Sequence, residues 1–267
     1  METRLPPGAR RLKLTIAYDG GPWTGWQTLP SGLTVQDKVE LALRKIAAAP
    51  LRIHGSGRTD AGVHALGQVA SFRIDRDWTA REWTKGFNAS LPEDIAVRSA
   101  AIMPDEFHAR YAARGKLYEY RIFNRPERPA IDRAYVWHLH KPLDLEAMQQ
   151  AASCLIGSHD FSSFEGTLTD NEDPVCHLEQ LSVTRQGNHL MIQAYADRFL
   201  KHMVRAIVGT LVEVGHAKRQ PQSLEDVLTL KDRTAAGRTA PPQGLFLVQV
   251  DYDHSAFPLT DPPTDNH

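Results

Sequence analysis

The sequence predicts an α+β fold with two sheet-containing halves. Strand-like runs with alternating apolar residues occur in both halves, amphipathic runs of helix length separate them, and a new strand opens the second half after residue 105. A chain of 267 residues has the length of one large domain or two small ones and can bury a sizeable core. We therefore expect domains over residues 1–105 and 106–255, followed by a flexible tail over 256–267.

The first half alternates strands and helices. Leu12, Leu14, Ile16 and Tyr18 fall on one face of an opening strand, and Thr34 is a suitable N-cap for the helix that follows. The remaining elements expected here are strands over 51–54, 63–74 and 95–103 and a helix over 79–88.

The second half repeats this mixture without a recognisable sequence repeat. The expected elements are strands over 116–123, 181–184, 190–194 and 245–252 and helices over 145–155, 199–214 and 223–230. Gly187 and Asn188 suit the positive φ angles of a tight hairpin between two of these strands. In the helix over 199–214, four polar residues recur at helical spacing beside an apolar face, namely Arg198, Lys201, His202 and Arg205. This pattern can place polar side chains of a functional site on one side of the helix. The alternative interpretation is an ordinary amphipathic surface helix.

Composition and charge limit the classes of function. The formal net charge of −1 argues against a broad polyanion-binding surface, so any nucleic-acid site has to be a local basic patch. No apolar run reaches the length of a membrane span, and the start has no apolar leader segment. Cys154 and Cys176 form no paired motif and are expected to be reduced thiols, as in a cytoplasmic protein.

The most informative segment is the glycine-rich stretch over residues 55–64, which contains Arg58 and Asp60. Its glycines permit a tight or left-handed backbone where a strand breaks into a loop, and a guanidinium stands beside a carboxylate. From this segment alone, a turn-capping role for Asp60 is as good an interpretation as a catalytic one.

Further segments favour a catalytic role for Asp60, because together they resemble one family. The stretch Gly57-Arg58-Thr59-Asp60-Ala61-Gly62-Val63-His64 resembles the signature loop of the tRNA pseudouridine synthase A family. Segments that resemble the same family in order are Tyr18-Asp19-Gly20, Gly25-Trp26-Gln27, Thr34-Val35-Gln36, Asn88-Ala89, Phe107-His108-Ala109-Arg110, Lys116-Leu117-Tyr118-Glu119-Tyr120, His159-Asp160-Phe161, residues 199–209 and Gly244-Leu245. Such an ordered set, from about residue 13 to 252, is far more specific than one motif.

The resemblance implies a pseudouridine synthase fold, in which two sheet-containing domains flank a central active-site cleft. It implies isomerisation of uridine at positions 38, 39 and 40 in the anticodon arm of tRNA, by a cytoplasmic homodimer without a cofactor. Asp60 matches the catalytic aspartate, and Arg58 and Arg205 match the arginines near it. Of these two, Arg205 is expected to orient Asp60 and Arg58 to contact RNA.

The resemblance also implies two substrate-binding residues. Tyr118 matches an active-site tyrosine that can stack on the target base, and its hydroxyl can assist proton transfer. Leu245 matches an apolar residue under that base. Without the resemblance, both would be interpreted as core residues. The cations grouped around the motifs are expected to contact RNA; they are Arg110, Arg114, Lys116, Arg121, Arg198 and Lys201.

Other functions have less support. His138, His140 and His159 lack the spacings of zinc ligands, so no metal site is expected. An aspartate-dependent hydrolase or phosphoryl-transfer enzyme lacks a P-loop or an acidic metal cluster. A catalytically silent tRNA-binding or tRNA-folding protein on the same scaffold is the remaining alternative, and the joint presence of Asp60, Arg58, Tyr118 and Arg205 argues against it. No further protein partner is implied. The loop over 170–174 is acidic and lies in a region that could face RNA, so the sequence does not assign the outer RNA contacts.

Overall fold

The computed structural model describes residues 10–47, 52–166, 173–253 and 255–256, which fold into two compact units. Unit 1 contains the described residues up to Arg114 and those from Gln249 onward, and unit 2 contains residues 115–248. The expected boundary near residue 105 differs from this division. The end of the chain returns to unit 1, where Tyr252 packs on Phe107 with ring centroids 5.1 Å apart and donates a hydrogen bond to the Ala109 carbonyl at 2.7 Å.

The sheet of unit 1 is antiparallel, with strands in the order β4-β1-β3 and β2 paired to β3. The strands are β1 (Arg10–Tyr18), β2 (His54–Gly55), β3 (His64–Ile74) and β4 (Ile95–Pro104). The predicted alternation in β1 is confirmed, since Leu12, Leu14 and Ile16 are fully buried. The predicted strand over 51–54 is wrong in extent. Only His54 and Gly55 pair with β3 before the chain leaves the sheet, and Leu51 lies outside the described residues.

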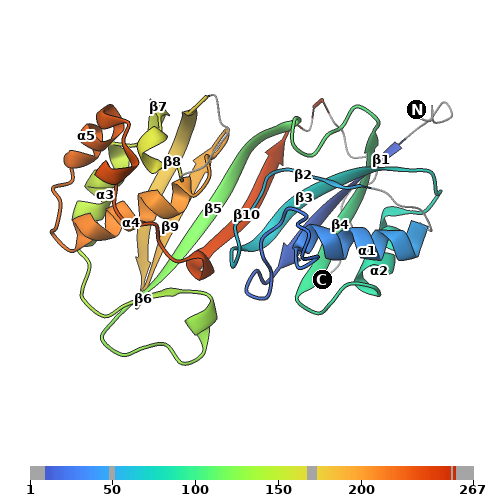
Figure 1. Ribbon diagram of the computed structural model, residues 1–267, viewed down its shortest axis with the longest axis horizontal. Helices are drawn as coiled ribbons and strands as arrows, with labels where there is room; N and C mark the ends of the chain where they lie inside the picture. The colour runs from blue at the N-terminus through green and yellow to red at the C-terminus, as the bar shows by residue number, and fades with distance from the viewer. Residues whose placement is uncertain (1–9, 48–51, 167–172, 254, 257–267) are drawn as a thin grey trace. The chain divides into compact units, whose positions relative to one another are not determined.

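Helices α1 (Val35–Ala47) and α2 (Ala80–Asn88) cover one face of this sheet (Figure 1). The expected N-cap is confirmed, because the Thr34 hydroxyl accepts a hydrogen bond from the Asp37 N–H at 3.2 Å. Helix α2 buries Trp83 and Phe87, whose rings meet Phe72 of β3 edge-on. The core of unit 1 therefore lies between these helices and the sheet.

The strands of unit 2 lie in the order β5-β9-β8-β7, and β6 pairs in parallel with β5. The strands are β5 (Ala113–Asn124), β6 (Trp137–Leu139), β7 (Gly157–Asp160), β8 (Val175–Gln186) and β9 (His189–Ala196). The hairpin between β8 and β9 turns at Gly187 with φ of 59°, as predicted. Strands β6 and β7 were not predicted, because three or four residues are too few to show a period-two pattern.

Strand β10 (Leu245–Tyr252) has the predicted bounds and runs from unit 2 into unit 1 at Gln249. Helices α3 (Leu145–Ser153), α4 (Met203–Gly215) and α5 (Ser223–Leu230) complete unit 2, with short 3-10 turns between elements. Helix α3 packs against α4 and β8. Helix α3 ends two residues before the predicted end, and α5 agrees with the prediction. The predicted flexible tail lies almost wholly outside the described residues.

The predicted start of the helix over 199–214 is wrong. His202 has a left-handed backbone with φ of 63°, so the helix begins at Met203, and Arg198, Lys201 and His202 do not share it with Arg205. Its amphipathic interpretation also fails, because eleven of its thirteen residues are buried. Helix α4 is a core helix from which the half-buried Arg205 projects.

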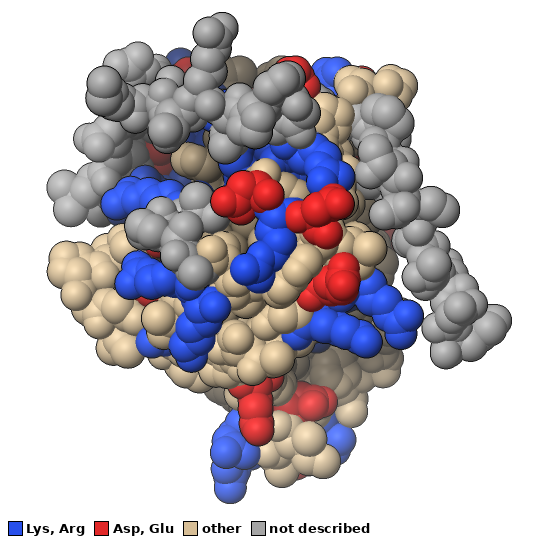
Figure 2. All heavy atoms as spheres, turned by 90° about the vertical axis from the view of Figure 1, so that its right-hand side faces the viewer, with Lys and Arg blue, Asp and Glu red and all other residues tan. Residues whose placement is uncertain are grey.

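Basic and acidic side chains are both present on the face drawn in Figure 2. Within the described ranges, no helix is long and apolar enough to cross a membrane.

Candidate functional site

Asp60 lies half-buried on the loop over residues 56–63, between β2 and β3 of unit 1. A fully buried amide, that of Gln68 on β3, holds the start of this loop. It donates to the Gly57 carbonyl at 3.0 Å and accepts from the Ser56 hydroxyl at 2.7 Å. Each of these buried polar groups has its partner, so the loop is fixed relative to the sheet.

A second segment, residues 18–28, holds the loop at the residue before Asp60. The Trp26 N–H donates to the Thr59 carbonyl at 3.1 Å, and the hydroxyls of Tyr18 and Thr59 lie 2.8 Å apart. Burial raises the pKa of the Tyr18 hydroxyl to about 12, although hydrogen bonds to Thr59 and Gln68 oppose this, so the hydroxyl stays protonated at neutral pH. The carbonyl and the hydroxyl of Thr59 are thereby both engaged, which restricts the backbone that carries Asp60.

The start of α1 holds this second segment in turn. The N–H groups of Val35 and Gln36 donate to the carbonyls of Gly25 and Trp26 at 3.1 and 3.0 Å, and the Gln36 side chain accepts from the Thr28 N–H. Three motifs that are separate in the sequence are therefore one hydrogen-bonded network around Asp60.

Gly25 makes a close steric contact in this network. Its φ is 95°, a conformation that favours glycine, and a Cβ added there would lie 2.7 Å from the Thr59 carbonyl oxygen.

Gly25→Ala should destabilise the protein by about 1–3 kcal/mol and also lower turnover, because the Thr59–Asp60 backbone has to shift. Gly32→Ala is a matched control, since Gly32 also has a positive φ of 65° but open space around its Cβ position. Urea unfolding and single-turnover rates measure both effects. Equal turnover in the two variants would show that the contact with Thr59 is unimportant.

Arg58 is exposed on the same loop, and its Nε donates to the Gln27 side chain at 3.3 Å. This position agrees with the expected contact to RNA, which stays a prediction.

Tyr118 lies on β5 in unit 2, opposite Ala194 of β9, and is 8% exposed. Its ring meets Phe199 edge-on, with centroids 5.1 Å apart. This packing fixes the orientation of the ring, which a stacking surface requires.

Arg205 and Leu245 are linked within unit 2 through the segment 240–245. The Arg205 Nε donates to the Ala240 carbonyl at 2.8 Å, and the Ala240 N–H donates to the Arg205 carbonyl at 3.0 Å. Tyr120 holds the next part of this segment, because its hydroxyl donates to the Pro241 carbonyl at 2.8 Å. Leu245 follows at the start of β10 and is 5% exposed. The sequence predicted no contact for Tyr120, since nothing in its alternation pattern reveals a partner 121 positions away.

The six cations expected to contact RNA differ in their surroundings. Arg114, Arg121 and Arg198 form ion pairs with Asp253, Glu119 and Asp173 at 3.1, 2.8 and 3.3 Å. Within the described part of the chain, Arg110 forms no ion pair. The RNA contacts of all six remain predictions.

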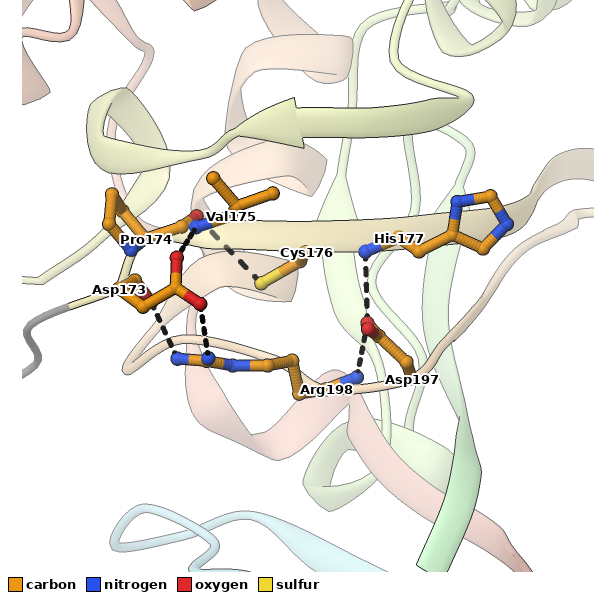
Figure 3. Close-up of polar contacts among 7 residues, drawn as sticks. All are labelled: Asp173, Pro174, Val175, Cys176, His177, Asp197 and Arg198. Carbon is orange, nitrogen blue, oxygen red and sulfur yellow. Dashed lines mark hydrogen bonds and ion pairs between the residues drawn. The ribbon is translucent and has the colours of Figure 1, made fainter.

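Arg198 binds the described end of the acidic loop (Figure 3). Its two terminal nitrogens donate to the carboxylate and the main-chain carbonyl of Asp173, at 3.3 and 2.6 Å. Asp197 accepts from the main-chain N–H groups of Arg198 and His177 at 2.6 and 2.9 Å. Residues 170–172 lie outside the described residues. Asp173 thus has a structural role in ordering the start of β8.

The cysteine and histidine residues considered in the sequence analysis make contacts typical of structural residues. Burial raises the pKa of the nearby Cys176 thiol to about 12, so this cysteine is protonated and unreactive at neutral pH. His138 and His159 each place a ring nitrogen against a main-chain carbonyl, at 2.9 and 3.0 Å. Among the described residues, no group of three potential metal ligands comes together.

Comparison with known proteins shows the class to which this chain belongs. A family model described as tRNA pseudouridine synthase matches residues 16–112 and 151–253. Asp60 and Arg58 lie in the first matched stretch, Arg205 and Leu245 in the second, and Tyr118 between the two. The chain is therefore similar to a class of RNA-modifying isomerases over most of its length.

Individual relatives narrow this class. A protein named tRNA pseudouridine synthase A from Geotalea uraniireducens (strain Rf4) is 44% identical over 243 residues, which are 91% of this chain and 100% of the relative. One of the same name from Escherichia fergusonii is 43% identical over 264 residues, covering 98% of this chain and 97% of the relative. The chain belongs to the tRNA pseudouridine synthase A family.

Proposed function

We propose that this protein isomerises uridine to pseudouridine at positions 38, 39 and 40 in the anticodon stem-loop of tRNAs, with Asp60 as the catalytic carboxylate. The observation that carries the proposal is 43% identity to a tRNA pseudouridine synthase A over 98% of the chain. The held position of Asp60 supports it, because a catalytic group requires a fixed geometry.

The reaction is an isomerisation and needs no net reagent. The bond from N1 of the base to C1′ of the ribose breaks, the base turns, and a bond from C5 to C1′ forms. The hydrogen at C5 leaves as a proton, and N1 gains one. A carboxylate can act as a nucleophile on the nucleoside or as a base toward the sugar without an external electron carrier. Asp60 supplies this carboxylate in our proposal, and no cofactor takes part.

The other site residues support this chemistry. Arg205 favours the ionised carboxylate, and its Nε bond to Ala240 fixes where its guanidinium can reach. Arg58 contacts RNA from its exposed position. Tyr118 stacks on the target base, and Leu245 packs under it. Six cations contribute to tRNA binding, namely Arg110, Arg114, Lys116, Arg121, Arg198 and Lys201. We further infer a cytoplasmic homodimer, which rests on the family resemblance.

Release of tritium from C5 tests the proposed reaction directly. A tRNA transcript labelled at C5 of uridine, incubated in a buffer that contains EDTA, should release one tritium to water for each pseudouridine formed. Mapping of pseudouridine in the same RNA should place the product at positions 38, 39 or 40. The control is a transcript without uridine at these three positions.

Two outcomes would contradict the proposal. Tight tRNA binding with no pseudouridine would favour the catalytically silent scaffold. Loss of activity in EDTA that one particular metal restores, after tRNA folding is controlled, would oppose chemistry by Asp60 alone.

A further inference from the structure

The turn over residues 107–112 in unit 1 is anchored through Ala109. The Ala109 N–H donates to the fully buried Ser71 hydroxyl at 3.0 Å, and its carbonyl accepts from Tyr252 at 2.7 Å. Ala109 itself is fully buried. Because both of its polar groups are engaged, the neighbouring side chains of His108, Arg110 and Tyr111 project from a fixed backbone.

His108 supports Tyr111 as a neutral ring. Its Nδ1 accepts hydrogen bonds from the N–H groups of Arg110 and Tyr111, at 3.1 and 3.4 Å, which requires an unprotonated nitrogen. Burial lowers the pKa of His108, and the electrostatic effects of His54, Arg11 and Arg110 lower it further. The imidazole is therefore neutral at physiological pH and can pack against other rings.

Three aromatic rings pack in series at this turn, with His108 between His54 and Tyr111. The centroids of His54 and His108 are 5.0 Å apart, and those of His108 and Tyr111 are 4.4 Å apart with the planes inclined by 33°. Tyr111 is the outermost ring and is 78% exposed. An exposed aromatic ring that another ring supports from beneath loses little conformational freedom when a flat ligand stacks on it.

A cation accompanies the exposed ring. The Arg110 guanidinium carbon lies 5.8 Å from the centroid of Tyr111. Arg110 forms no ion pair with any described residue, whereas Arg114, four positions later, is paired with Asp253. An aromatic face beside an arginine with no acidic partner among the described residues combines two features that single-stranded nucleic acids recognise, a stacking surface and a phosphate contact.

We propose that Tyr111 and Arg110 bind one unpaired nucleotide of the substrate tRNA other than the target uridine. The base stacks on the outer face of Tyr111, and the adjacent phosphate contacts Arg110. This inference rests on the proposed function and adds to it a second nucleotide site on the turn over residues 107–112.

Tyr111→Ala and Tyr111→Phe separate the ring from the hydroxyl. Tyr111→Ala should weaken tRNA binding by about 5- to 150-fold, the range measured for loss of one base–aromatic stack, and Tyr111→Phe should retain most of the affinity. Leu230→Ala is the control for loss of an exposed apolar side chain, since Leu230 is 64% exposed on α5. Arg110→Gln should reduce the slope of log affinity against log salt by about 0.7, as expected for one phosphate contact with a single strand.

Ultraviolet cross-linking tests the contact directly. Trypsin cleaves after Arg110 and Arg114, so the peptide over residues 111–114 should carry the cross-linked nucleotide. Wild-type affinity and salt dependence in Tyr111→Ala and Arg110→Gln would overturn the inference. So would a change in oligomeric state with unchanged tRNA affinity, since the surface would then contact a second copy of the chain. Pseudouridine formation by the wild-type protein in the same preparation distinguishes these outcomes from failure of the proposed function.

Discussion

Asp60→Asn should lower the single-turnover rate of pseudouridine formation by at least about a thousandfold while leaving tRNA affinity nearly unchanged. The amide has the size of the carboxylate, and main-chain and Thr59 contacts hold the loop, so the substitution should not disturb the fold. It removes the negative charge that a nucleophile or base requires. The measurement is the single-turnover rate alongside filter-binding affinity.

Asp77→Asn is the matched control for this prediction. Asp77 is 92% exposed and pairs with Arg10 at 2.7 Å, an exposed ion pair that contributes little to stability. Its variant should keep the wild-type rate. Mass spectrometry of the Asp60→Asn protein has to exclude deamidation of the introduced asparagine back to aspartate. A folded Asp60→Asn protein with near wild-type turnover would disprove the proposed mechanism.

Tyr118→Phe should slow the same step by about a hundredfold or more with unchanged tRNA affinity, if the hydroxyl assists proton transfer. The phenylalanine ring keeps the edge-on contact with Phe199, so packing and any base stacking are preserved. Tyr118→Ala removes the ring as well and should also lose about 1–3 kcal/mol of binding free energy.

The pair of variants separates three roles of Tyr118. Wild-type turnover in Tyr118→Phe with weakened binding in Tyr118→Ala would leave stacking as its only role. Wild-type rates and affinities in both would mean that Tyr118, which is 8% exposed, is a core tyrosine. Thermal unfolding of both variants shows whether any loss of rate comes from loss of folded protein.

Local patterns predicted several elements correctly for physical reasons. Strand β10 and helix α5 have the predicted bounds, and Gly187 turns the β8–β9 hairpin. Period-two alternation identified β1, because a strand with alternate residues buried shows this pattern directly. The resemblance of ordered segments along the chain pointed to the family that the comparisons show.

Predictions from the sequence were wrong for features that depend on residues far away in the chain. A helix was expected from residue 199, but the left-handed backbone at His202 delays it to Met203. His202 packs closely on Gly166, where an added Cβ would lie 2.5 Å from its Nδ1, and no local pattern reveals that neighbour. Burial of α4 on nearly all sides likewise depends on the elements that pack around it.

The sequence by itself determined the family, the local elements with strong periodicity and the candidate carboxylate at Asp60. Only the tertiary structure decided how that carboxylate is held. Thr59 is bound by Tyr18 and Trp26, and Gly25 leaves room for its carbonyl oxygen. These contacts join segments that lie far apart in the chain, whereas propensity and periodicity report only on neighbours along it. Hydrogen bonds between distant segments form only when the sheet and helices bring their donors and acceptors together.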